Sequence, residues 1–460
     1  MAFVVLTILL TACFLLGGSA RGDVASLMVL RPLVALGLAG GLLCLGAGEI
    51  KRNRHVLAFL VTVAGLPLLY LIPLPPEIWM RLPGRDLVAD IDRAAQLGSL
   101  WRPLTLAPET TWNAFYASLV PLTVVVLGFH LREGHRQLLL PTLLVLGGCS
   151  VLLGLLQTAG PPDGPLYLYR VTNNGAQVGL FANRNHQALL MAMLLPMLGV
   201  LAARLSHGSP GQHVIGLCLV AAGVALLPLL LITGSRMGLI AGVAAILALP
   251  AIVGTRPIRL QRSGGAVAPP ISRRLRLIAG CALVLVGATI VGLTVSWGQG
   301  LALDRLLSRA IGDDMRLRML PTVGTMIVRY WPVGSGVGSF EKVYKVNEPD
   351  ALLGPEYVNH AHNDWLETLA TTGALGLVMI AIAAYALAAR GRQAWSTRGS
   401  AGSEGQLVRL GFVLIGLAAL ASLGDYPLRV PSLAALFAVS VLWAGCPFDS
   451  SRPMTDFEKT

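Results

Sequence analysis

The feature that most constrains this chain is a series of long apolar stretches that recur over nearly its whole length. A helix needs about 20 apolar residues to cross the hydrocarbon core of a bilayer. Of the 460 residues, 55% are hydrophobic and only 13% are charged, whereas a soluble domain carries about a quarter charged residues. Twelve stretches suit a crossing: 2–20, 33–49, 56–74, 114–130, 138–158, 186–204, 213–233, 237–254, 276–296, 364–389, 406–424 and 430–446. The sequence therefore predicts an all-α polytopic membrane protein with about 12 transmembrane helices, and it excludes a soluble enzyme and a disordered chain.

The basic residues indicate how these helices are oriented. Lys and Arg gather in the short connections, for example at 51–54, 132–136 and 256–276, whereas long connections such as 75–113 and 297–363 mix acidic and basic residues. Short basic loops stay in the cytoplasm. Both termini are therefore predicted to be cytoplasmic and the long connections periplasmic. The net charge of +12 is explained by this orientation, so no nucleic-acid partner is expected.

This orientation divides the chain into four parts. We predict transmembrane helices 1–9 in residues 1–296, a large periplasmic loop between helices 9 and 10 at 297–363, helices 10–12 in 364–446, and a cytoplasmic tail at 447–460. The six cysteines are scattered singly. No disulfide framework or zinc knuckle is expected from such spacing.

Polar residues gather at the predicted periplasmic ends of the helices. Ionisable groups at membrane depth are costly, so each is a functional candidate. The candidates fall into four clusters and a last periplasmic turn with Asp425 and Arg429. The clusters contain Asn183, Arg184 and Asn185; Arg236; Arg316 and Arg318; and His360, His362, Asn363 and Asp364.

Arg236 stands in a tight turn between two strongly apolar stretches, beside Gly234 and Gly238. A guanidinium held at the membrane boundary can clamp phosphate oxygens in a planar bidentate geometry, and it stays charged at any relevant pH. The structural alternative is an arginine that extends from a helix end to the interface, or one that pairs with Asp425. Arg236 by itself does not decide between these roles.

Arg316 and Arg318 precede Pro321, which suits the first turn of a helix. The apolar residues from Met319 to Tyr330 recur at three- and four-residue spacing, which predicts an amphipathic helix lying on the outer leaflet and ending near Pro332. The glycines at 334–338 are interpreted as a flexible turn. The two arginines are candidates for phosphate binding, with interfacial anchoring as the alternative.

His362 stands at the start of the tenth predicted helix, with His360, Asp364 and Glu367 nearby. A helix N-terminus disfavours the imidazolium, so a histidine there would be neutral and available as a general base. The acidic residues can also be explained as helix caps. On a helix the two histidines would point to opposite sides; on an extended segment both could face one way and, with Asp364, resemble a metal site. No clear third and fourth ligand follows, so no metal is predicted.

Taken together, these motifs resemble the O-antigen ligase superfamily, which includes O-antigen ligases and related surface-polysaccharide polymerases. His362-Asn363 followed by Gly373-Ala-Leu-Gly376 fits its His-Asn…Gly-x-x-Gly pattern. Thr233-Gly-Ser-Arg236-Met-Gly238 resembles its Ser/Thr-Arg-Gly turn, and Phe181-Ala-Asn-Arg-Asn185 its Asn-x-Asn motif. The stretch 316–340 resembles its Arg…Pro-x-Gly-x-Gly-x-Gly-x-Phe segment.

The resemblance implies inverting transfer of a glycan from undecaprenyl pyrophosphate to an acceptor hydroxyl, at the periplasmic face of the bacterial inner membrane. The acceptor would be the lipid A core, a protein or a growing polysaccharide. Catalytic roles would fall on His362, Arg236 and Arg316, the last preferred to Arg318 because it stands five residues before Pro321. Because the donor carries its own activation, neither a cofactor nor a metal is expected; membrane lipid is an expected partner. Candidates for substrate binding are Arg318, Asn183, Arg184, Asn185, His360, Asn363, Asp364 and Arg429.

Three alternatives remain at this stage. The first is a polysaccharide polymerase of the same superfamily, which uses the same donor chemistry with another acceptor. The second is an anion transporter, for example for bicarbonate, and the third is a non-catalytic assembly factor. A transporter is expected to carry charges near mid-span and broken helices. The polar clusters stand instead at the predicted ends of the helices, which favours an enzyme.

Overall fold

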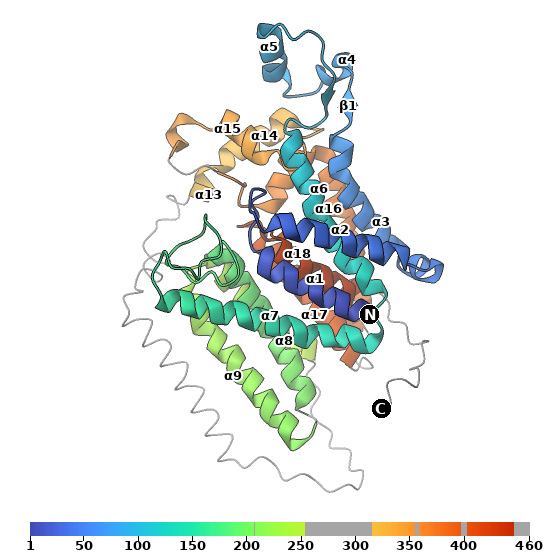
Figure 1. Ribbon diagram of the computed structural model, residues 1–460, viewed down its shortest axis with the longest axis vertical. Helices are drawn as coiled ribbons and strands as arrows, with labels where there is room; N and C mark the ends of the chain where they lie inside the picture. The colour runs from blue at the N-terminus through green and yellow to red at the C-terminus, as the bar shows by residue number, and fades with distance from the viewer. Residues whose placement is uncertain (207, 254–314, 355–357, 397–402, 446–460) are drawn as a thin grey trace. The chain divides into compact units, whose positions relative to one another are not determined.

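Long apolar helices dominate the computed structural model (Figure 1), which describes residues 1–206, 208–253, 315–354, 358–396 and 403–445. Within these ranges, eight helices are long and apolar enough to cross a membrane, and three shorter apolar helices accompany them. Strand structure in the same ranges is limited to one antiparallel pair, β1 (Pro73–Leu74) and β2 (Arg102–Pro103). The prediction of a multi-pass helical membrane protein is confirmed.

Eleven of the twelve predicted stretches overlap a helix in the described ranges. These helices are α1 (Ala2–Leu16), α2 (Leu27–Leu43), α3 (Ala47–Tyr70), α6 (Pro108–Phe129), α7 (Glu133–Ala159), α8 (Arg184–Leu205), α9 (Pro210–Ile232), α10 (Arg236–Val253), α16 (Asp364–Ser396), α17 (Ser403–Ala421) and α18 (Pro431–Gly445). The stretch 276–296, residues 297–314 of the predicted loop and the tail 447–460 lie outside the described residues. Helix α3 begins earlier than predicted because its first turns accommodate the polar residues 49–54, and Glu49 caps the backbone N–H of Gly46 at 3.1 Å.

Shorter elements occupy the connections. They are α4 (Pro76–Trp79), α5 (Asp86–Ala94), α13 (Met315–Arg318), α14 (Leu320–Tyr330), α15 (Phe340–Asn347) and the 3₁₀ turns η2 (Asp350–Leu352) and η3 (Pro427–Arg429). Helix α14 has a proline in its first turn, as its sequence predicts.

The chain forms two compact units. The first comprises residues 1–132, 310–390 and 419–460, and the second comprises 133–309 and 391–418. In the first unit, α6 packs against α2, α3 and α18, and α18 also packs against α1 although almost the whole chain separates them (Figure 1). The backbone N–H of Ser432 at the start of α18 donates to the carbonyl of Gly17 at 3.1 Å. The two ends of the chain thus build one helical core.

In the second unit, α8 is the central helix. It packs against α7, α9 and α10, and 72% of its apolar window is buried. Because α9 returns the chain between them, α8 and α10 run in the same direction. Gly238 of α10 lies directly against Ala188 of α8, which brings the beginnings of these two helices together.

Helix α16 is interrupted at Gly373, and the turn at 332–336 packs against it there. Gly373 has φ +56° and ψ −136° inside the helix, and a Cβ there would overlap the carbonyl of Pro332. The carbonyls of Ala370 and Thr371, near this break, accept hydrogen bonds from the backbone of Ser335 at 3.1 Å and Gly336 at 2.8 Å. The predicted turn at 334–338 is present, and these hydrogen bonds connect it to α16. This turn lies tightly against α16, because the glycines allow a backbone approach that their spacing alone did not reveal.

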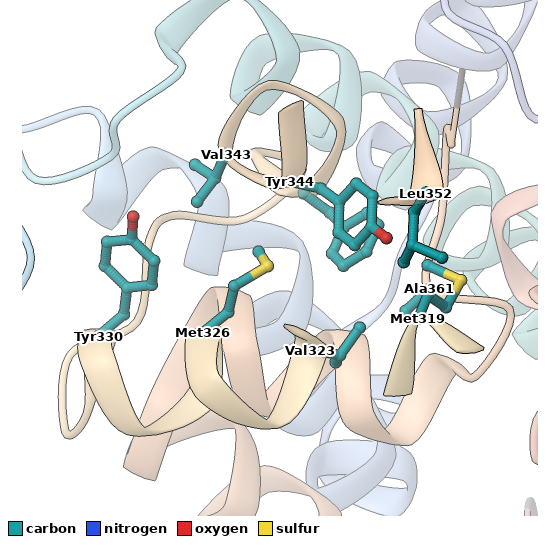
Figure 2. Close-up of a cluster of buried hydrophobic side chains, with 9 residues drawn as sticks. Met319, Val323, Met326, Tyr330, Val343, Tyr344, Leu352 and Ala361 are labelled. Carbon is teal, nitrogen blue, oxygen red and sulfur yellow. The ribbon is translucent and has the colours of Figure 1, made fainter. Parts of the chain in front are cut away.

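The amphipathic helix α14 faces protein rather than lipid. Figure 2 shows its apolar side chains directed at α15, η2 and the segment before α16. The buried cluster contains Met319, Val323, Met326, Tyr330, Phe340, Val343, Tyr344, Leu352 and Ala361. The helix itself is confirmed, but the apolar face expected to contact the outer leaflet packs against protein instead. The periodicity of one helix shows that a face is buried and does not show what buries it.

Replacement of Gly373 by alanine tests the α16 break. Alanine in this left-handed conformation costs about 1–2 kcal/mol, and its Cβ would also displace the Pro332 carbonyl. We expect Gly373→Ala to lower the free energy of unfolding by at least about 2 kcal/mol, measured as a lower melting temperature of the purified protein. The control is Gly324→Ala in α14, where a Cβ meets nothing within 4 Å and stability should be equal or higher. Equal melting of Gly373→Ala and wild type would show that the break is not required.

Candidate functional site

His362 lies in a non-helical segment directly before α16, neither on the helix nor in extended backbone. Its φ of +49° is left-handed, a conformation uncommon for a residue other than glycine but one in which His is enriched. The next residue fixes this segment: the side-chain carbonyl of Asn363 accepts from the N–H of Leu366 at 3.1 Å, and its amide donates to the carbonyl of Leu423 at 3.0 Å. Backbone strain held in place this way is typical of functional sites.

The ring of His362 is oriented by a carboxylate. Its Nδ1 lies 3.4 Å from Oδ1 of Asp425, whose side chain is only 4% exposed, whereas the His362 side chain is 23% exposed. An ionised carboxylate can only accept a hydrogen bond. The contact therefore favours the tautomer with the proton on Nδ1 and leaves the lone pair on Nε2 for a proton from another molecule.

Tyr426 lies against both histidines. Its ring centroid is 4.3 Å from that of His360 and 5.0 Å from that of His362, and its hydroxyl accepts from the amide of Asn359 at 3.4 Å. The two histidines have different acidic partners. His362 contacts Asp425, whereas Nδ1 of His360 lies 3.1 Å from Oε1 of Glu367. In the described part of the chain, no group of three or more His, Cys, Asp or Glu side chains is arranged to hold a metal ion.

Arg429 ties the beginning of α16 to the turn after α17. Its Nε donates to Asp364 at 3.0 Å, and its Nη2 lies 3.1 Å from Glu367. Glu367 also accepts from the backbone N–H of Ala361 at 2.8 Å. Burial acts to lower the pKa of Arg429, but the carboxylates of Glu367 and Asp364 outweigh it, so the pKa is raised. Asp364 and Arg429, which the sequence suggested for substrate binding, thus bind each other and hold the backbone next to His362.

The structure separates the two arginines at the start of the described part of the 297–363 loop. Arg316 is half-buried and its Nη1 donates to the carbonyl of Gly424 at 2.7 Å, next to Asp425. Arg318 is exposed and donates to the carbonyl of Ala351 at 3.2 Å. Arg316 is therefore the arginine that lies beside the His362–Asp425 pair.

The remaining candidates lie in the second unit, at the beginnings of α8 and α10. Asn183 caps α8, accepting from the N–H of Asn185 at 2.9 Å, and the N–H of Arg184 donates to Asn173 at 3.1 Å. Arg236 is the first residue of α10. Two helix N-termini that lie together, each with an arginine in its first turn, make an electropositive region suited to an anion.

Residues 221–381 match the family model described as O-antigen ligase. The match covers 161 of the 460 residues and supports a relationship of this segment to the O-antigen ligase superfamily. The match includes Arg236, Arg316 and His362 and confirms the resemblance drawn from the motifs. No curated protein and no solved structure matches the chain.

Two residues beyond the end of the O-antigen ligase match complete the environment of His362. Asp425 and Tyr426 stand some 60 positions after the histidine, and no motif pairs them with it. The sequence marks Asp425 as an acidic residue in a short turn between two apolar stretches and as a possible partner of Arg236, not of His362. That signal marks a candidate, but the pairing depends on how α16 and α17 place their ends.

Removal of Arg429 should expose the structural role of its ion pairs. Arg429→Gln leaves two carboxylates without their cation, and breaking a buried pair this way costs about 3–5 kcal/mol. We expect a markedly lower melting temperature of the purified protein. The control Arg318→Gln removes the same charge from an exposed site and should change stability by no more than about 0.5 kcal/mol. Similar melting of both variants would contradict the structural role of Arg429.

Proposed function

We propose that this protein transfers a glycan from undecaprenyl pyrophosphate to an acceptor hydroxyl at the periplasmic face of the inner membrane, as an O-antigen ligase. The observation that carries the proposal is the pairing of His362 with Asp425, within and beside the segment that matches the O-antigen ligase family. The superfamily comprises ligases and polymerases of surface polysaccharides. The donor, the acceptor and the mechanism below are our proposal.

His362 is the general base of this mechanism. Its Nε2 takes the proton of the acceptor hydroxyl as the oxygen attacks C1 of the donor sugar. The bond between C1 and the diphosphate oxygen breaks, and its electron pair leaves with the diphosphate. Attack from the face opposite the leaving group inverts the anomeric centre. A general base in such a step typically contributes about 10²–10⁴-fold, and the Nδ1 contact with Asp425 supplies the tautomer that the step requires.

Arg236 and Arg316 stabilise the leaving diphosphate. Negative charge builds on its oxygens as the C1–O bond breaks, and a well-aimed donor there contributes about 3–4 kcal/mol. The half-buried position of Arg316 beside Gly424 supports its role, as does the place of Arg236 at a helix N-terminus. Both arginines, like His362, lie within the segment that matches the family model.

Substitution of these three residues tests the mechanism. In a transfer assay with purified protein and a lipid-linked glycan, we expect His362→Ala to lower the rate by about 10²–10⁴-fold. Arg236→Ala and Arg316→Ala should each lower it by about 10²–10³-fold. Asp425→Asn should lower kcat more than it changes KM, because it alters the tautomer and not a substrate contact. Arg93→Ala removes an exposed arginine that pairs with Asp90 at the surface and should keep the wild-type rate.

A folded His362 or Arg236 variant with near-normal turnover would refute the role assigned to that residue. The acceptor is identified by deletion of the protein followed by gel analysis of the surface glycans. Loss of all attached glycan supports a ligase. A single attached repeat would instead identify a polymerase.

A further inference from the structure

A cavity of about 760 Å³ lies in the first unit, and its lining includes none of the residues assigned to glycan transfer. Its walls come from the connection between α1 and α2, from the first turns of α2 and from α6. Most of the lining is apolar, including Met28, Pro32, Ala35 and Leu119. Met28 is 76% exposed, so the cavity reaches the outer surface of α2. Its volume is within the usual range for a small-molecule site.

Arg31 places a positive charge in this apolar wall. Its Nη2 donates to the side-chain carbonyl of Asn113 at 2.8 Å, and its guanidinium lies 5.1 Å from the ring centroid of Tyr116. Neither partner carries a negative charge. Across the described ranges no carboxylate pairs with Arg31, and Asp23 on the cavity wall is bound by Arg21 at 2.7 and 2.9 Å. A charged side chain on a membrane helix costs free energy when no opposite charge lies near it. An anion bound in the cavity would lower this cost.

The surroundings of Arg31 match the depth of lipid headgroups. Tyr116 and Trp112 stack in the first turns of α6 with ring centroids 6.1 Å apart, and both are exposed. Trp and Tyr gather at the membrane–water interface. The exposed large side chains that follow Arg31 along α2, such as Leu33 and Leu36, are apolar. An occupant of the cavity therefore needs an anionic head beside Arg31 and an apolar chain along α2.

We propose that this cavity binds an anionic glycerophospholipid. The guanidinium of Arg31 holds the phosphate, Asn113 orients the guanidinium, and an acyl chain covers Met28, Pro32, Ala35 and Leu119. A free phosphate ion would satisfy Arg31 but leave this apolar wall uncovered. The open side at Met28 gives a bilayer lipid direct access to the site.

The test measures lipid retention by the full-length protein, purified and reconstituted in phosphatidylcholine vesicles with or without phosphatidylglycerol. We expect wild type to retain phosphatidylglycerol in preference to phosphatidylcholine and to melt at a higher temperature in its presence. Arg31→Gln should weaken this binding about tenfold or more, because it removes a charge-assisted contact. Arg31→Lys should keep part of it, and Ala35→Phe should lose it by filling the apolar wall. Arg93→Gln, which removes an exposed charge elsewhere, should bind as wild type does.

Three results would overturn the proposal. One is equal retention of phosphatidylglycerol by wild type and Arg31→Gln. Another is the same rise in melting temperature with inorganic phosphate, which would show a simple anion site. The third is displacement of phosphatidylglycerol by a smaller amount of polyprenyl phosphate, which would make the lipid carrier the occupant. If Arg31→Gln does not fold, retention of phosphatidylglycerol by Ala35→Phe and Arg31→Lys is compared with that by wild type instead.

Discussion

The regular hydrogen bonding of helix α16 is interrupted at Gly373. Backbone groups near this break instead bond to residues 332–336. The carbonyls of Ala370 and Thr371 receive the glycine-containing turn, and the N–H of Ala374 donates to Pro332 at 2.8 Å. The Tyr70 hydroxyl at the end of α3 donates to the carbonyls of Val333 and Thr372. An unsatisfied backbone group in an apolar environment costs several kcal/mol. These segments therefore hold one another in a fixed position.

The same junction includes a buried cation. Arg85 is fully buried and donates to the carbonyls of Pro83, Leu104 and Gly334. Burial lowers its pKa to about 10, with the nearby tyrosines acting in the opposite direction, so it remains charged at neutral pH. In this way the connection after α3 is fixed to the glycine turn. Next to this junction, α14 and α15 pack together around the buried apolar cluster described above (Figure 2).

Helices and clusters were predictable from the sequence to different degrees. Apolar length alone located the helices, because the bilayer sets that length, although it misplaced the start of α3 where charged residues continue the helix. The motifs around Arg236, Arg316 and His362 identified the family, because they are local in sequence. The Asp425 contact, the glycine junction and the partner of α14 all depend on segments far apart in the chain. The pattern of residues within one segment does not show which distant segment it contacts.

The central proposal is that Arg236 and His362 both take part in transfer from the lipid-linked diphosphate donor. It is tested most directly by photolabelling with a polyprenyl diphosphate that carries a photoreactive group next to its phosphates, followed by identification of the labelled peptides. We expect label on the beginning of α10 at Arg236 and on the segment 358–363 that carries His362. A lipid alcohol with the same reactive group but no diphosphate should label neither. Label confined to one of the two segments, or equal label from the lipid alcohol, would contradict the claim.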